Sequence, residues 1–168
     1  MGTAVQLSGS MAVDSPFIVF KFLHIAMMFT AVAGAVIPEV VLHVVANTRD
    51  TRAIATMAHI AERIGKVLPV FFIGGAIFGL LAAWTGQMDF TAPWLIATYV
   101  LFVTAIVAGI LFSDPWVARL RSAAVASGDA PSAELVAVID EPRAKIASAW
   151  LMLTILVIIS LMVFKPGV

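Results

Sequence analysis

Four long apolar stretches constrain this chain more than any other feature of its sequence. They cover about residues 17–46, 67–84, 94–112 and 146–164, and the last three contain no Asp, Glu, Lys or Arg. Each is close to the roughly 20 residues that a helix needs to cross about 30 Å of hydrocarbon. Lipid offers the backbone no hydrogen-bond partners, and the alternation typical of barrel strands is absent. The stretches therefore predict four membrane-spanning helices.

The composition supports a lipid environment. Hydrophobic residues make up 62% of the chain and charged residues 12%, and the mean hydropathy is +1.07. A soluble domain is nearer half apolar and a quarter charged. A water-soluble fold of 168 residues leaves too much surface exposed to bury so many apolar side chains. The ten basic and ten acidic residues give a formal net charge of zero, so the chain has no overall positive charge to attract nucleic acid. The predicted partners are the lipid bilayer and either further copies of the chain, as a homo-oligomer, or a larger membrane complex.

The positions of Lys and Arg indicate an orientation. Eight of the ten basic residues fall in the connections between the first and second stretches and between the third and fourth. They are Arg49, Arg52, Arg63, Lys66, Arg119, Arg121, Arg143 and Lys145. Because basic residues accumulate in cytoplasmic loops, both connections are predicted inside and both termini outside a bacterial inner membrane. Trp84 and Trp94 flank the short outer turn, where an aromatic belt is expected.

Both inner connections are also expected to be helical. Asp50 can cap a helix that continues into the second span, and Gly128 is a plausible stop for the extended third span. Residues 132–140 form a short amphipathic segment, after which Pro142 opens the fourth span. The predicted fold class is all-α: an integral membrane four-helix up-down bundle whose helices extend past the cytoplasmic face.

The predicted domain organisation is simple. Residues 1–16 are expected to be a disordered leader outside the membrane, and residues 17–166 a single four-helix transmembrane domain. Gly75 and Gly79 make a G-x-x-x-G step in the second span. Such a step lets another helix approach closely, and it equally lets a flat cofactor lie against the backbone. Both interpretations stay open.

One group of candidate ligands lies near the outer boundary of the first span. His24 is followed on the same helical face by Met27 and Met28. Lys21 and Lys165 are expected at a similar depth. Imidazole and thioether ligands suit haem iron or Cu(I), and the ammonium groups can pair with haem propionates. Alternatively, Met fills gaps in the packing, the lysines snorkel, and His24 bonds a neighbouring backbone or hydroxyl group.

A second group lies near the inner boundary. Glu39 and His43 are four residues apart on the first span, and His59 and Glu62 lie on the next helix. Carboxylate–histidine pairs on facing helices hold Zn or iron in helical bundles, so Glu39, His43 and His59 are candidate metal ligands. Alternatively this is a solvated polar face on which Glu62 pairs with Lys66. No motif identifies a catalytic residue, and whether the protein is an enzyme stays open.

Short motifs along the chain carry a resemblance to a known group of membrane proteins. They are Lys21-x-x-His24 with Gly34 and Pro38 in the first span, Glu62-Arg63, Pro69 and Gly79 in the second, and the closing Val163-Phe164-Lys165-Pro166. From about Phe17 to Pro166 the chain resembles the four-helix proteins around HemJ-type protoporphyrinogen oxidases and their CopD-like copper-resistance relatives. It is most similar to a branch of predicted integral membrane proteins that share this ending.

The resemblance implies that His24 is a haem b ligand. The oxidase branch also has a His/Lys pair opening its third span, where this chain reads Trp94-Leu95-Ile96-Ala97-Thr98-Tyr99. The second ligand and the catalytic base are therefore missing from their expected places. We expect a haem-b-binding bundle, with Lys21, Met28 and Lys165 near His24, that acts in membrane electron transfer alone or as an accessory subunit.

Two other classes stay open. The first is a non-enzymatic membrane component, either a structural subunit or a small permease for copper or another solute. The second is a metal-dependent enzyme at the inner site.

Overall fold

The computed structural model describes residues 16–166, so the leader expected over residues 1–16 lies outside the described residues except for Pro16. The elements are α1 (Pro16–Thr48), α2 (Thr51–Gly65), α3 (Leu68–Thr85), α4 (Pro93–Ala108), the π-helical turn η1 (Gly109–Ser113), α5 (Asp114–Ala126), α6 (Ala133–Ile139) and α7 (Pro142–Phe164). Within this range all regular structure is helical, which confirms the predicted all-α class.

Four helical segments are long and apolar enough to cross a membrane. They are Pro16–Thr48, Thr51–Thr85, Pro93–Ala126 and Ala133–Phe164. In the most apolar part of each segment only 11–17% of the residues are buried within the chain. Water would not tolerate so much exposed apolar surface. The prediction of four candidate membrane spans in a multi-pass protein is therefore confirmed.

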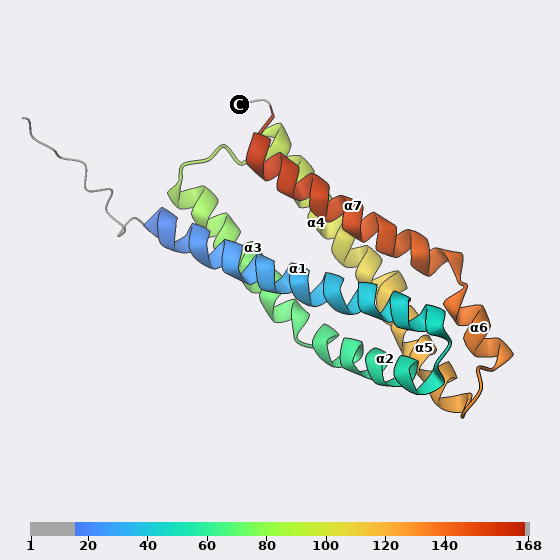
Figure 1. The fold of residues 1–168 in the computed structure, drawn as a ribbon. Coiled ribbons are helices and arrows are strands. Elements are labelled where there is room, and N and C mark those ends of the chain that lie inside the picture. Colours follow the sequence, from blue (N-terminus) through green and yellow to red (C-terminus); the bar gives the residue numbers. More distant parts are fainter. Residues whose placement is uncertain (1–15, 167–168) are drawn as a thin grey trace, which may run out of the picture.

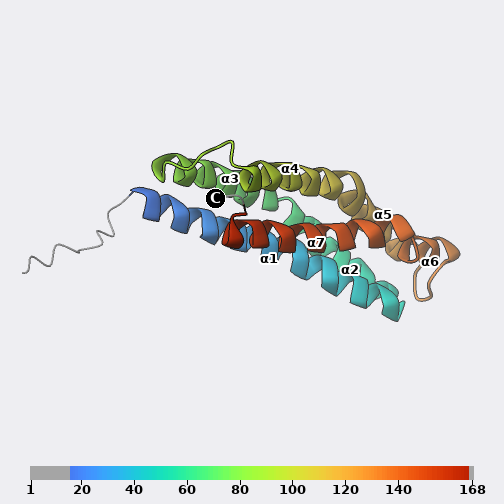
Figure 2. The ribbon, with the colours of Figure 1, turned by 90° about the horizontal axis from the view of Figure 1, so that it is seen from above.

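The long helices are arranged as two pairs (Figures 1 and 2). α1 lies along α3, and α4 lies along α7. α2, α5 and α6 gather at one end of the molecule, which we call the charged end, and the α3–α4 connection lies at the other, the turn end. α1 has little contact with α7, so the two pairs are joined chiefly where α2 packs on α5.

A buried cluster at the charged end forms the largest core of the described chain. This charged-end core comprises Leu42, Ala46, Ile54, Ala58, Trp116, Val117, Leu120, Ala123, Ala124, Leu135, Ile139 and Ala144. The indole Nε1 of Trp116 donates to the Val138 carbonyl at 3.0 Å, so its one polar atom is satisfied. Around the core, Arg121 forms an ion pair with Glu62 at 2.7 Å, which replaces the Glu62–Lys66 pair considered from the sequence.

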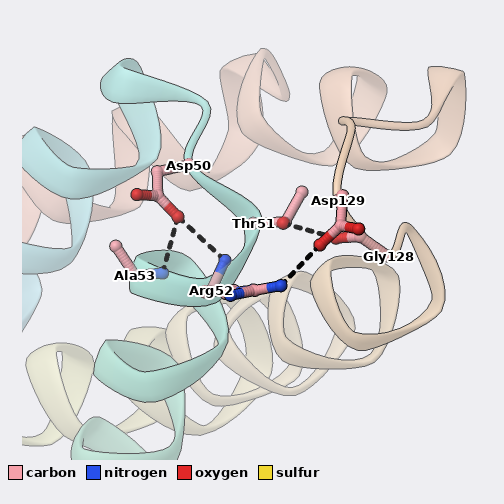
Figure 3. Close-up of polar contacts among 6 residues, drawn as sticks. All are labelled: Asp50, Thr51, Arg52, Ala53, Gly128 and Asp129. Atoms are coloured by element: carbon pink, nitrogen blue, oxygen red, sulfur yellow. Dashed lines mark hydrogen bonds and ion pairs between the residues drawn. The ribbon is translucent and has the colours of Figure 1, made fainter.

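The predicted helix caps at this end are confirmed (Figure 3). The Asp50 carboxylate accepts two backbone N–H groups of the first turn of α2, each at 3.0 Å. Gly128 has a φ of +66°, the left-handed conformation of a helix stop. Thr51 Oγ1 donates to the Gly128 carbonyl at 2.6 Å, and Arg52 pairs with Asp129 at 2.7 Å. The start of α2 is thereby tied to the end of α5.

Prolines divide two helices that the sequence analysis treated as continuous. The helix predicted from Thr51 into the second span is interrupted between Gly65 and Leu68, where Pro69 lies in the first turn of α3. The third span opens into η1 just before Pro115. Proline has no N–H, and its ring crowds the carbonyl four residues earlier, so the helical ladder loses a hydrogen bond at either position, as it also does at Pro38, through which α1 continues.

The turn end differs from the expected aromatic belt at one position. Trp84 is 69% exposed, as a belt residue should be, whereas Trp94 is 7% exposed and packs in a small cluster with Ala92 and Leu95.

In the connection between Trp84 and Trp94, Thr91 donates its hydroxyl and its N–H to Asp89 Oδ1 at 2.6 and 2.8 Å. These bonds, the hydroxyl's foremost, hold the pKa of the Asp89 carboxyl below its ordinary value.

The charged-end core predicts a sharp contrast between two positions of α5. Leu120→Ala removes a fully buried side chain and is expected to lower the free energy of unfolding by about 2–5 kcal/mol. Val125→Ala, at a position that is 68% exposed, is the matched control and should change it by less than about 0.5 kcal/mol. Denaturant titration of the detergent-solubilised protein, followed by circular dichroism, measures both. Equal effects would contradict this core.

Candidate functional site

Glu39 is the only buried ionisable residue in the part of the chain that the structure describes. Its side chain lies on α1 and the residue is 8% exposed. Ser148 of α7 donates its hydroxyl to Glu39 Oε1 at 2.5 Å. A carboxyl group withdrawn from water needs such a hydrogen bond, a counter-charge or a proton. Glu39 therefore forms a polar contact between the two helix pairs, where α1 meets α7.

His43 lies one turn further along α1 and completes this cluster. Its Nδ1 is 3.0 Å from the backbone carbonyl oxygen of Glu39, and its Nε2 is 3.5 Å from Ser148 Oγ. A carbonyl oxygen only accepts hydrogen bonds, so we infer that Nδ1 carries the proton and that the lone pair of Nε2 faces Ser148. The ring packs on Trp116 with the centroids 4.5 Å apart. We call Glu39, His43 and Ser148 the Glu39 site.

A groove of about 240 Å³ gives access to the Glu39 site. Its lining residues are Glu39, Val40, His43, Val44, Asn47, Ser148, Ala149 and Met152. Asn47, His43 and Glu39 follow one another at intervals of four residues, which places them on one face of α1. The polar side of the groove thus leads from Asn47, near the charged end, to the buried carboxyl group.

The arrangement is suited to moving a proton. The Ser148 hydroxyl has one hydrogen and three acceptors within reach: Glu39 Oε1, His43 Nε2 and the Ala144 carbonyl at 3.0 Å. Rotation of this hydroxyl changes which acceptor it serves. A Ser–His–acid triad would require the carboxylate to orient His43 through Nδ1. Here Nδ1 contacts a backbone carbonyl instead, so the cluster does not have the geometry of a nucleophilic triad.

The candidate metal ligands are only partly brought together. Glu39 and His43 lie in one site, but His59 is exposed on α2, because the face of α2 that packs inward is formed by Ile54 and Ala58. Within residues 16–166, no three His, Asp or Glu side chains lie close enough to hold a metal ion. The three-residue metal site considered from the sequence is therefore not assembled within these residues.

Ser148 was missed by the sequence analysis. The only signal in the sequence is a hydroxyl within an apolar helix, and Thr154 and Ser160 give the same signal nearby. Which of the three faces Glu39 depends on the register between α1 and α7, and one sequence does not contain that information.

His24 lies against α3. Its Nδ1 is 2.7 Å from the Gly75 carbonyl oxygen. A Cβ added at Gly79 would lie 2.7 Å from the same ring atom, and one added at Gly75 would lie 2.6 Å from the sulfur of Met28. The G-x-x-x-G step therefore brings α3 against α1, so its glycines serve helix packing here.

The four residues expected around a haem have separate partners. Met28 packs on Gly75, and the His24 ring packs on Gly79 and bonds the Gly75 carbonyl. The ammonium group of Lys21 lies 5.7 Å from the centre of the Phe17 ring, and that of Lys165 lies 5.6 Å from the Trp94 ring. Each of the four thus has its own contact on α1, α3 or α4, and haem binding by the set stays a prediction. Among the potential ligand atoms of these four residues, only Nε2 of His24 takes no part in the contacts described above.

The glycine contacts between α1 and α3 can be tested with a matched pair of substitutions. Gly79→Ala places a methyl group against the His24 ring and is expected to destabilise the protein by about 1–3 kcal/mol. Gly65→Ala is the control, since an added Cβ there meets nothing within 4 Å, and it should be neutral or slightly stabilising. Unfolding in detergent measures both, and a neutral Gly79→Ala would argue against the close approach.

Comparison of the chain with protein-family models, with curated protein sequences and with solved structures finds no match. The resemblance to HemJ-type oxidases and CopD-like proteins is therefore untested and stays a prediction. The chemistry of the Glu39 site has to be inferred from its own geometry.

Proposed function

We propose that this protein is a non-enzymatic, multi-pass membrane component that takes up and releases a proton at the Glu39 site. The observation that supports this most directly is the buried carboxyl group of Glu39, bonded by Ser148 from the other helix pair. Ionisable groups within membrane spans are costly, and they typically mark proton or ion pathways. The proposal accounts for the one group of this kind that is buried within residues 16–166.

The proposal includes an orientation. The chain is an up-down four-helix bundle in a bacterial inner membrane, with both termini outside and the charged end in the cytoplasm. Eight of its ten Lys and Arg residues support this placement, because they lie in the two connections that belong to the charged end. In this orientation the groove beside Asn47 exposes the Glu39 site to protons from the cytoplasmic side.

The proposed proton transfer involves three groups. A protonated Glu39 donates its hydrogen to Ser148 Oγ while the Ser148 hydroxyl passes its own hydrogen to His43 Nε2. Glu39 becomes a carboxylate, His43 becomes an imidazolium, and Ser148 is unchanged. The His43 Nδ1–H keeps its bond to the Glu39 carbonyl at 3.0 Å throughout, which stabilises the charged ring. Water in the groove then takes the proton from His43.

Such a transfer would be coupled to the arrangement of the helices. The Glu39–Ser148 bond is one of few contacts between α1 and α7. Its strength depends on the charge of Glu39, because a hydrogen bond to a carboxylate is roughly twice as strong as one to a neutral acceptor. Proton uptake would therefore loosen the contact between the helix pairs. This suits either a proton-coupled solute permease or a proton-sensitive subunit of a larger complex.

Infrared difference spectroscopy across a pH titration tests the proposal on the full chain in liposomes. The wild-type protein is expected to show a C=O band of a protonated carboxyl group that disappears as the pH rises. Glu39→Gln should remove this band without unfolding the protein, and Ser148→Ala should shift its frequency, because the hydroxyl bonds the same group.

The matched control is Glu134→Gln, since Glu134 is an exposed carboxyl group on α6 and the band should survive its removal. A band that persists in Glu39→Gln would exclude Glu39 as the proton-binding group.

A second candidate function is membrane electron transfer with haem b bound through His24. One observation favours it: the Nδ1–H of His24 donates to the Gly75 carbonyl at 2.7 Å, which leaves Nε2 as a free lone pair. Ligating histidines are commonly oriented by a backbone carbonyl in this way. Haem would supply one-electron chemistry when bound, and His24 would hold it through Nε2. The second ligand would come from another copy of the chain or another subunit.

An absorption spectrum of the purified protein, together with a copper analysis, tests the haem function and the copper alternative. The haem proposal requires a Soret band that His24→Ala abolishes and His43→Ala, at the Glu39 site, leaves in place. The copper alternative requires bound copper that is lost on His24→Ala and on either Met27→Ala or Met28→Ala. A colourless, copper-free sample after incubation with haem and with Cu(I) would contradict both of these and leave the proton proposal unaffected.

A further inference from the structure

A second cavity lies at the charged end, apart from the Glu39 site. It has a volume of about 200 Å³ and is lined by Leu111, Phe112, Arg119, Glu141, Arg143 and Ala144. The lining comes from three elements, η1, α5 and the start of α7. The cavity combines two guanidinium groups with two large apolar side chains, which are 60% and 44% exposed for Leu111 and Phe112.

The two arginines of the cavity differ in the hydrogen bonds and ion pairs that they form. Arg119 donates to Glu141 Oε2 at 2.7 Å and to the Pro115 carbonyl at 3.3 Å, so its guanidinium is held in place with further N–H groups to spare. Arg143 is exposed and forms no ion pair with another residue in the range 16–166. Glu141 neutralises only one of the two positive charges. The cavity therefore keeps a net positive charge of about one.

The apolar side of the cavity is a consequence of η1. Pro115 prevents the regular helical ladder from continuing, and the helix widens so that the Asp114 N–H bonds the Gly109 carbonyl. Leu111 and Phe112 belong to this widened turn. From Phe112 back to Pro93 the chain carries no charged residue, and beyond Phe112 the charged residues are Asp114, Arg119 and Arg121. The cavity thus lies where hydrocarbon would give way to headgroups.

We propose that this cavity binds the phosphate headgroup of an anionic phospholipid. The phosphodiester would be bonded by Arg143 and by the remaining N–H groups of Arg119, and an acyl chain would lie against Leu111 and Phe112. Basic pockets between transmembrane helices are known to select anionic headgroups. The exposed apolar pair beside the arginines favours a lipid over a free phosphate ion, because a free ion gains nothing from it.

The test measures lipid binding to the full chain in detergent by native mass spectrometry, with phosphatidylglycerol as the anionic lipid and phosphatidylcholine as the neutral one. Wild type is expected to bind phosphatidylglycerol preferentially. Arg143→Gln should weaken that binding about fivefold, since one basic group near a membrane surface has roughly that effect. Arg143→Lys keeps the charge and should retain most of the binding. Circular dichroism verifies that each variant is folded.

Arg63→Gln is the matched control, because Arg63 is exposed on α2 at the same end and does not line the cavity. An equal loss in Arg63→Gln would mean general attraction to a basic surface and would overturn the site. Equal binding of both lipids, or no effect of Arg143→Gln, would overturn it too. Competition by inorganic phosphate as strong as that by phosphatidylglycerol would overturn the lipid as the ligand.

Discussion

Burial of apolar side chains at the charged end holds together two helix pairs that otherwise share few contacts. α1 contributes Leu42 to this core, α5 contributes Trp116, and α7 contributes Ala144. Leu42 lies one residue before His43, and Ala144 lies one turn before Ser148, so the same packing fixes both sides of the Glu39 site. The Glu39–Ser148 hydrogen bond is therefore a consequence of the core, since one bond worth about 1 kcal/mol could not align two helices.

Prolines mark the points at which helices of this chain change in composition or in geometry. Pro69 separates the membrane-crossing α3 from the amphipathic α2, and Pro115 produces the π-helical turn between α4 and α5. Pro38 lies inside α1, directly before Glu39. A proline leaves the carbonyl four residues earlier without its helical partner. Each of the three prolines lies close in the sequence to a charged residue: Glu39 follows Pro38, Lys66 precedes Pro69, and Asp114 precedes Pro115.

The sequence was sufficient for the features that depend on local chemistry. Long apolar runs identified the spans, and Asp50, Gly128 and Pro142 identified helix ends, because capping depends on the residue itself. It was insufficient wherever two distant helices meet. Ser148 gave no distinctive signal, and His59 looked like a partner of Glu39 only while the rotation of α2 was unknown. The glycine step allowed both a cofactor and a helix, and the side chains of α1 occupy that space.

The choice between a metal and a proton at the Glu39 site depends on how many ligands the site offers. A structural or catalytic zinc ion takes at least three protein ligands, and the only carboxylate and imidazole here are those of Glu39 and His43. Much of the remaining groove lining is apolar, including Val40, Val44 and Met152. A proton needs only one acceptor and a route. It also neutralises Glu39, which removes most of the cost of keeping that carboxyl group away from water. The apolar lining that disfavours a metal ion also makes a charged Glu39 costly, so uptake of a proton would change the strength of the contact between α1 and α7.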